Sequence, residues 1–400
     1  MEIKKVLKIS AATAALVASF SACSGGGEET EPESLHHTAL CTSDTTTAIS
    51  GTISSNATWG ASSGTACYSI TGTVKVNAST LTIEPGTIVY GTTATSYLAI
   101  LPGAAIDAQG NATSPIVFTS AEEVAGYEGK QGQWGGLSIF GNAVSNKGTE
   151  QYEADATITF GSSNSSYDTE SSGTLDYVMV RNTGYAVTAD AELNGLSLGG
   201  VGNGTTITNV ASINGKDDGI EIWGGTVNLT NVYIESASDD SFDLDHGYRG
   251  TADNMKIVCD STSDRGIEAD SKSTSDAGSP VATPTIKNMT ITTDAASDAA
   301  MHWREGIQPT LENVVINYNG TKASTYAIEV ADNATAGTQI LSATNVEIIS
   351  TGSADYSLDG VDTSSSLPSG VTHPGSATAN NGANATAFDW ISTYETAKGL

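Results

Sequence analysis

Short β-type runs dominate the hydrophobic pattern of this chain. Each run has three to five residues, and turn residues such as Pro85-Gly86 and Pro102-Gly103 separate the runs. Half-buried strands alternate apolar and polar residues in this way, whereas an amphipathic helix repeats about every 3.6 residues. Long helical periodicity is missing, so the pattern predicts an all-β protein. The runs include Val74–Val76, Leu81–Ile83, Thr87–Tyr90, Leu98–Leu101, Ile116–Thr119 and Leu137–Phe140.

An asparagine motif recurs at a longer period. In each copy an asparagine precedes alternating apolar residues, and successive copies lie 22, 23, 34, 25 and 32 residues apart. A coil of about 22–25 residues is one rung of a three-sided β-helix, and longer intervals indicate loops at one corner. Because stacked rungs place equivalent residues about 4.8 Å apart, we expect a ladder of buried, hydrogen-bonded asparagines. The copies begin at Asn209, Asn231, Asn254, Asn288, Asn313 and Asn345.

An acidic motif repeats in step with the asparagines. Two different motifs at one common period predict a single-stranded parallel β-helix, because a propeller or sandwich would not produce them. We expect this solenoid to span residues 41–385, with Cys41 and Cys67 near its first rung and a C-terminal cap at 386–400. There the aromatics of Phe388–Tyr394 are expected to cover the last rung. The copies are Asp217–Ile222, Asp239–Asp245, Asp264–Asp270, Asp298–Arg304 and, more faintly, Tyr326–Val330.

Several of these motifs resemble a family of bacterial surface lipoproteins, including spirochaete outer-membrane lipoproteins. The resemblance runs from about Ile70 to Trp303 and implies a right-handed parallel β-helix of pectin-lyase-like architecture in the cell envelope. It implies no reaction, and His302 is not part of the family pattern. The matching segments are Leu81–Thr87, Trp134–Leu137 with Gly141-Asn142, Leu193–Gly202, Asp217–Glu221 with Gly224–Val227, Asp239–Asp243, and Asp264–Glu268.

The N-terminus has the order of a lipoprotein leader. Residues 1–22 combine three lysines with an apolar stretch of 12 residues and end in Phe20-Ser21-Ala22 before Cys23. We expect cleavage there, lipidation of Cys23 and a flexible acidic tether over 23–40. Phe20 stands where leucine is commoner, and the alternative is an ordinary signal peptide cut before a structural cysteine. Ser24 favours the outer membrane as the location.

Export would change the expected state of Cys41 and Cys67 and the net charge of the chain. An oxidising compartment allows a Cys41–Cys67 disulfide worth roughly 3–4 kcal/mol, although two free thiols remain the alternative. Removal of residues 1–22, which carry three lysines and one glutamate, changes the formal net charge from −29 to −31. Nucleic acid is excluded as a partner because its binding needs clustered Lys and Arg. The expected partners are a membrane through the lipid, and a glycan, a cation or an outer-membrane protein.

The acidic motif predicts two outward columns of polar side chains. If Ile220, Phe242, Ile267, Met301 and Ile328 fill the core, alternate residues must point outward. Carboxylates one rung apart repel by about 1–3.5 kcal/mol, so a charged neighbour, solvent or a cation must relieve them. The first column is Glu221, Asp243, Glu268, His302 and Glu329, and the second is Trp223, Asp245, Asp270 and Arg304.

Three interpretations of these columns remain open. In the first, His302 and Arg304 neutralise Glu268 and Asp270, while Asp217, Asp239 and Asp264 hydrogen-bond their own turns. The second is a cation site, most plausibly for Ca²⁺, whose ligands would be oxygens of adjacent rungs. Its candidate ligands are Glu221, Asp243, Asp245, Glu268 and Asp270.

The third interpretation is a glycan-cleaving site in a polysaccharide lyase or glycoside hydrolase. Carboxylates on adjacent rungs would lie about 5 Å apart, as in retaining glycoside hydrolases. Carboxylates two rungs apart would lie about 9.5 Å apart, as in inverting ones. The weak catalytic candidates are Asp240, Asp243, Glu268 and Arg265, and no lysine accompanies the arginines at short spacing.

For ligand binding we single out Trp223, His246 and Arg304, with Trp223 as an exposed sugar platform and Trp303 in the core. The favoured function is a surface lipoprotein that presents an acidic face for binding. A polysaccharide-cleaving enzyme and an envelope spacer without a ligand are the alternatives.

Overall fold

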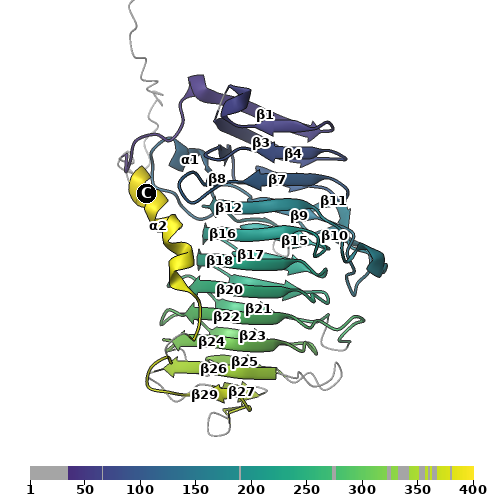
Figure 1. Ribbon diagram of the computed structural model, residues 1–400, viewed down its shortest axis with the longest axis vertical. Helices are drawn as coiled ribbons and strands as arrows, with labels where there is room; N and C mark the ends of the chain where they lie inside the picture. The colour runs from purple at the N-terminus through teal and green to yellow at the C-terminus, as the bar shows by residue number, and fades with distance from the viewer. Residues whose placement is uncertain are drawn as a thin grey trace, which may run out of the picture. The chain divides into compact units, whose positions relative to one another are not determined.

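The structure is a computed structural model of the chain, and Figure 1 shows a long stack of strands. It describes residues 35–400 except 65, 189–190, 273–275, 322–325, 332–341, 351–355, 359–360, 363–366 and 379–380. The predicted leader, Cys23 and most of the tether therefore lie outside the described residues. Residues 35–400 form one compact unit. No helix in the described part of the chain has the length and apolar character needed to cross a membrane.

The strands stack in parallel into three faces, which confirms the predicted β-helix. The first face consists of β6 (Tyr97–Ile100), β9 (Leu137–Phe140), β15 (Leu196–Gly199), β17 (Ile220–Trp223), β19 (Asp240–Asp245), β21 (Arg265–Ala269), β23 (Ala299–Trp303), β25 (Ile328–Val330) and β27 (Tyr356–Leu358). The second face begins with β2 (Ala57–Trp59), β4 (Thr80–Ile83) and β7 (Ala105–Gln109). The third face contains β5 (Ile88–Gly91), β8 (Ile116–Ser120) and, at its far end, β29 (Val371–Thr372).

Longer strands bend around the corners between faces. Two of them, β1 (Thr46–Ile53) and β3 (Cys67–Val76), join the third face to the first. The others join the second face to the third, and they are β12 (Gly173–Arg181), β16 (Thr206–Gly215), β18 (Asn228–Ala237), β20 (Thr251–Val258), β22 (Thr285–Thr292), β24 (Thr310–Tyr318) and β26 (Ser342–Ser350).

The asparagine motif forms the corner between the second and third faces. Each of its six asparagines has a positive φ, between 50° and 61°, which side chains other than glycine and asparagine adopt reluctantly. The side-chain amide of Asn231 donates to Asn209 Oδ1 at 2.9 Å, and that of Asn254 donates to Asn231 Oδ1 at 2.7 Å. Asn288 donates instead to Asp253 at 2.6 Å, so the ladder is interrupted where the longest loop intervenes. The predicted ladder is confirmed, although its members are mostly half-buried rather than buried.

Replacement of Asn231 tests why the corner uses asparagine. We expect Asn231→Ala to lower the free energy of unfolding by about 2–3 kcal/mol, because it removes two hydrogen bonds and forces alanine into a left-handed conformation. Asn231→Gly keeps the conformation and should lose only the hydrogen bonds, about 1–2 kcal/mol. Denaturant titration of both variants measures the difference. Equal losses would mean that backbone conformation contributes nothing here.

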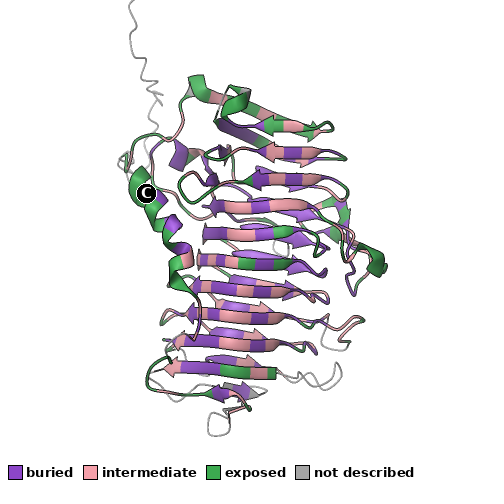
Figure 2. Ribbon diagram, viewed as in Figure 1, coloured by how far each residue is buried: buried purple, intermediate pink, exposed green. Residues whose placement is uncertain are grey.

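The C-terminal segment does not cover the last rung, so that prediction is wrong. It returns along the third face, and helix α2 (Asp389–Lys398) reaches the upper rungs (Figure 1). Trp390, Ile391 and Tyr394 are buried there against the outward apolar residues of the third face, and Figure 2 shows buried positions along this helix. The reason is an outward apolar column that needs a cover, and its members are Cys67, Ile88, Val117, Met179 and Ala211.

The remaining elements are local additions to the solenoid. The Cys41–Cys67 disulfide is present and ties the segment before β1 to the third face. Two antiparallel hairpins lie beside the first face, β10 (Glu150–Tyr152) with β11 (Asp155–Phe160), and β13 (Tyr185–Thr188) with β14 (Ala191–Leu193). The short elements are α1 (Ala121–Val124), β28 (Val361–Asp362), and 3-10 turns at Ser43–Thr45, Ala61–Ser63, Ser165–Tyr167 and Ala385–Phe388.

Candidate cation site on the first face

The predicted register of the acidic motif is confirmed. Glu221 pairs with Asp243, which pairs with Glu268, and the column continues to His302 and Glu329. The alternate residues from Ile220 to Ile328 are fully buried in the core, as is Trp303. Strand alternation therefore directs every carboxylate of this column away from the core.

The upper part of the face is covered, which the sequence did not indicate. Trp223 is only 4 % exposed, because it packs between Tyr152 and Phe160 of the first hairpin at ring-centroid distances of 5.7 and 6.0 Å. The interpretation of Trp223 as an exposed sugar platform is therefore wrong. Glu221 beside it is also buried, and its Oε2 accepts a 2.6 Å hydrogen bond from the amide of Asn194.

The lower carboxylates are neutralised, as the first interpretation proposed. Arg304 contacts Glu268 at 2.6 Å and Asp270 at 2.8 Å, and His302 Nδ1 lies 3.4 Å from Glu268. Arg265 adds contacts to Glu268 at 3.0 Å, Asp264 at 2.7 Å and Asp240 at 3.7 Å. Against the effect of burial, His302 and the two arginines hold the pKa of Glu268 below its ordinary value. These predicted metal ligands, Glu268 and Asp270, already have cationic partners.

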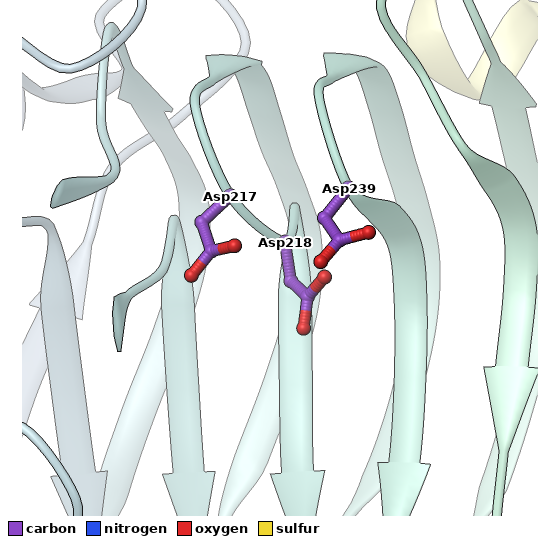
Figure 3. Close-up of side chains that lie close together, drawn as sticks. All are labelled: Asp217, Asp218 and Asp239. Carbon is purple, nitrogen blue, oxygen red and sulfur yellow. The ribbon is translucent and has the colours of Figure 1, made fainter. Parts of the chain in front are cut away.

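The upper carboxylates have no such partner. Oxygens of Asp218, Glu221 and Asp243 lie within 4.8 Å of one another, as do those of Asp217, Asp218 and Asp239. Figure 3 shows the second group, with Asp217 and Asp218 on one rung and Asp239 on the next. Among the described residues, no Lys, Arg or His nitrogen lies within 4 Å of these five carboxylates.

The turn aspartates behave differently from the first interpretation. Asp218 Oδ1 accepts a hydrogen bond from the backbone N–H of Asp240 on the next rung, at 2.9 Å, whereas Asp264 pairs with Arg265. No described residue donates a hydrogen bond to the side chain of Asp217 or Asp239 in its own turn. Asp218, which was not among the predicted ligands, is thus a member of the cluster. The two adjacent aspartates, Asp217 and Asp218, were the sequence signal that could have indicated this cluster.

Burial and mutual repulsion raise the pKa values of this cluster. Burial, with added repulsion from neighbouring carboxylates, raises the pKa of Asp218, Glu221 and Asp243 well above the ordinary range. For the half-buried Asp217, burial together with Glu192 and Asp239 raises the pKa to about 8. Proton uptake is one way to relieve such a cluster, and a bound cation is another.

The raised pKa values predict how stability depends on pH. A carboxyl that binds its proton more tightly in the folded state stabilises that state at low pH, and this contribution is lost as pH rises. For Asp217 the stabilisation is lost as pH rises from the pKa in the unfolded state, 3.8, to the pKa in the folded state, about 8. In the absence of divalent cations we therefore expect the melting temperature to fall between about pH 5 and pH 8, by several degrees. Calorimetry in a chelator measures it, and a flat or rising profile would contradict the predicted protonation.

The cluster fits a hard divalent cation. Calcium takes six to eight oxygen ligands, and carboxylates on adjacent rungs, backbone carbonyls and water supply them. Asp243 Oδ1 has no accessible surface and no hydrogen-bond donor among the described residues, so it lacks the partner that a buried acceptor requires. Of the predicted ligands, Glu221 and Asp243 lie in the cluster, while Asp245, Glu268 and Asp270 do not.

The second outward column and His246 form a separate group. His246 Nδ1 lies 2.7 Å from Glu150 of the first hairpin, whereas its Nε2 lies 3.6 Å from Asp245 and contacts Lys147. Burial raises the pKa of Asp245 to about 6. His246 thus anchors the hairpin to the solenoid, and Arg304 is held by two carboxylates. Neither of these predicted binding residues is free of protein partners.

The catalytic candidates do not form an acid–base pair with a free base. Although burial opposes it, Asp240 and Glu268 raise the pKa of Arg265 above its ordinary value, so this guanidinium is a poor proton acceptor. Asp240 is buried, and burial raises its pKa well above the ordinary range. The arrangement of Asp240, Asp243, Glu268 and Arg265 therefore supports charge compensation rather than proton transfer.

The fold and this face define a parallel β-helix protein with an acidic outer column. Over residues 51–395 the chain matches the family described as the pectate-lyase-like β-helix domain, and it belongs to that family. No curated protein matches the chain. No solved structure matches it either.

Proposed function

We propose that this protein is an exported, lipid-anchored envelope protein whose first face binds Ca²⁺ through Asp218, Glu221 and Asp243. The observation that carries the proposal is the contrast along one column. Glu268 has two arginines and a histidine around it, whereas the three upper carboxylates lie within 4.8 Å of one another without a cationic side chain. Carboxylates held this close must either bind protons or share a cation, and a bound cation leaves them ionised.

The proposed location rests on the chain's N-terminal order and its cysteines. Residues 1–22 have the pattern of a leader that ends before Cys23, and the Cys41–Cys67 disulfide suits an oxidising compartment. The resemblance of several motifs to bacterial surface lipoproteins, among them spirochaete outer-membrane lipoproteins, supports the proposal of an outer-membrane site. A glycan or an envelope protein is the proposed partner of the acidic face, and the bound cation would reduce its negative charge.

Calcium is expected to stabilise the folded protein. Saturation at a hundred times the dissociation constant adds about 2.7 kcal/mol, because the ligand binds the folded state only. Melting curves with Ca²⁺, with Mg²⁺ and with chelator measure this, and Mg²⁺ should shift them less because it demands stricter octahedral geometry. No shift at millimolar Ca²⁺ would discard the site. A glycan array with and without Ca²⁺ tests the partner, and release of reducing or unsaturated ends from a bound polysaccharide would establish an enzyme instead.

A further inference from the structure

The first rung ends the solenoid with an open strand edge. Among the described residues, β1 pairs only with β3, and β2 pairs only with β4. Figure 1 shows β1 at the end of the stack. A parallel strand directs its N–H and C=O groups to both sides, so β1 leaves a row of backbone groups without a strand partner.

The hydrophobic core is also open at this end. Ile49 and Ile53 of β1 are in register with the fully buried Ile70 and Val76, and Ala57 of β2 is in register with Leu81. Their side chains point inward, yet all three are only partly buried. The first rung therefore presents apolar side chains in line with an unpaired strand edge, which is the surface that another rung would cover.

Charge is missing from this end of an otherwise acidic molecule. Residues 45–74 contain no Asp, Glu, Lys, Arg or His, although the formal net charge of the chain is −29. Exposed edge strands usually carry charges or proline that prevent pairing, and β1 has neither. Two copies of the chain repel one another through their acidic residues, and residues 45–74 add no charge to this repulsion.

We infer that the first rung is a dimer interface, on which a second copy of this chain docks head to head. A twofold axis places the two β1 edges side by side in antiparallel orientation, so that each supplies the hydrogen bonds that the other lacks. Ile49, Ile53 and Ala57 of the two copies then close a common core. A lipid surface would cover the apolar side chains but supplies no regular partner for strand N–H and C=O groups.

The experiment uses the exported chain with Cys23→Ser, which removes the proposed lipid site. Light scattering over a dilution series should give twice the monomer mass, with dissociation at or below micromolar concentration. Ile49→Lys should shift the dissociation constant at least tenfold upward, because its charge would be buried between the copies. In the monomer the long lysine side chain can reach solvent at the open end. The matched control is Ala48→Lys on the same strand, whose side chain is exposed and points away from the core.

Several outcomes would overturn the inference, and melting curves distinguish them from misfolding. A monomer at every concentration, with β1 amides protected from hydrogen exchange, would mean that residues 23–34 cover the edge. A monomer that sediments with phosphatidylcholine vesicles would mean that this end meets the membrane. A dimer that neither Ile49→Lys nor Ala48→Lys weakens would place the interface elsewhere. Because β1 is distant from Asp243 in the stack, loss of the dimer leaves the Ca²⁺-dependent melting shift unchanged.

Discussion

Arg181→Met is expected to lower the free energy of unfolding by about 3–5 kcal/mol, because it leaves a buried carboxylate without its partner. Arg181 Nε lies 3.1 Å from Glu123, whose side chain is 2 % exposed, and Nη1 lies 2.6 Å from Glu395 of helix α2. Loss of the guanidinium therefore removes the charge that compensates Glu123 and releases the contact that holds α2 to the third face. Denaturant titration of the purified protein measures the loss.

The double variant Arg181→Met with Glu123→Gln separates the two effects. It removes the buried charge together with its partner, so it should recover more than half of the loss. Lys272→Met, which breaks an exposed pair with Asp276, is the control and should cost at most about 1 kcal/mol. If the single variant is as stable as the double variant, burial of Glu123 without Arg181 is not costly and the ion pair has no structural role.

The solenoid was predictable because each rung repeats the one before it. The register of Glu221 with Asp243 and Glu268 follows from equal spacing and strand alternation, without knowledge of distant contacts. The same holds for the asparagine corner, where one residue type satisfies both the positive φ and the hydrogen bonds along the stack. Nearest-neighbour contacts dominate such a fold, so local sequence contains most of the information.

The elements that cover the solenoid were not predictable in the same way. Arg181 and Glu395 are 214 residues apart, and neither the helix nor the hairpins repeat. One signal was available: the run Ile116-Val117-Phe118 is apolar on both sides of the strand, and a strand with two apolar sides is covered on both. The same reasoning applies at Trp223, which is a large apolar residue on the outward side of β17 and is therefore expected to be covered.

The site was predicted only in part. Strand alternation determines to which side of the strand a side chain points, but not which side chains surround it. It placed Glu221 and Asp243 in one outward column, but the arginines that neutralise Glu268 come from its own strand (Arg265) and from the next rung (Arg304). Whether a carboxylate is compensated depends on side-chain conformation, which the spacing of motifs does not contain. Asp218 joined the cluster for a similar reason, because its carboxylate turns toward the next rung.

Asp243→Asn is expected to have opposite effects with and without calcium. In chelator the variant should be more stable than the unsubstituted protein by about 1–3 kcal/mol near neutral pH, because residue 243 no longer has to bind a proton or bury a charge when the protein folds. With calcium present it should lose most of the stabilisation that the cation provides, since a ligand oxygen and a negative charge are both removed. The order of the two melting temperatures therefore reverses between chelator and millimolar Ca²⁺.

This reversal separates a cation site from a merely crowded cluster. Glu312→Gln is the matched control, because it removes one carboxylate from β24 on the second face, away from Asp218 and Glu221. It should leave the calcium shift intact. If Asp243→Asn raises the melting temperature equally in chelator and in calcium, the carboxylates are relieved by protons alone. The raised pKa values would then be the whole consequence of their burial, and the first face would bind no divalent cation.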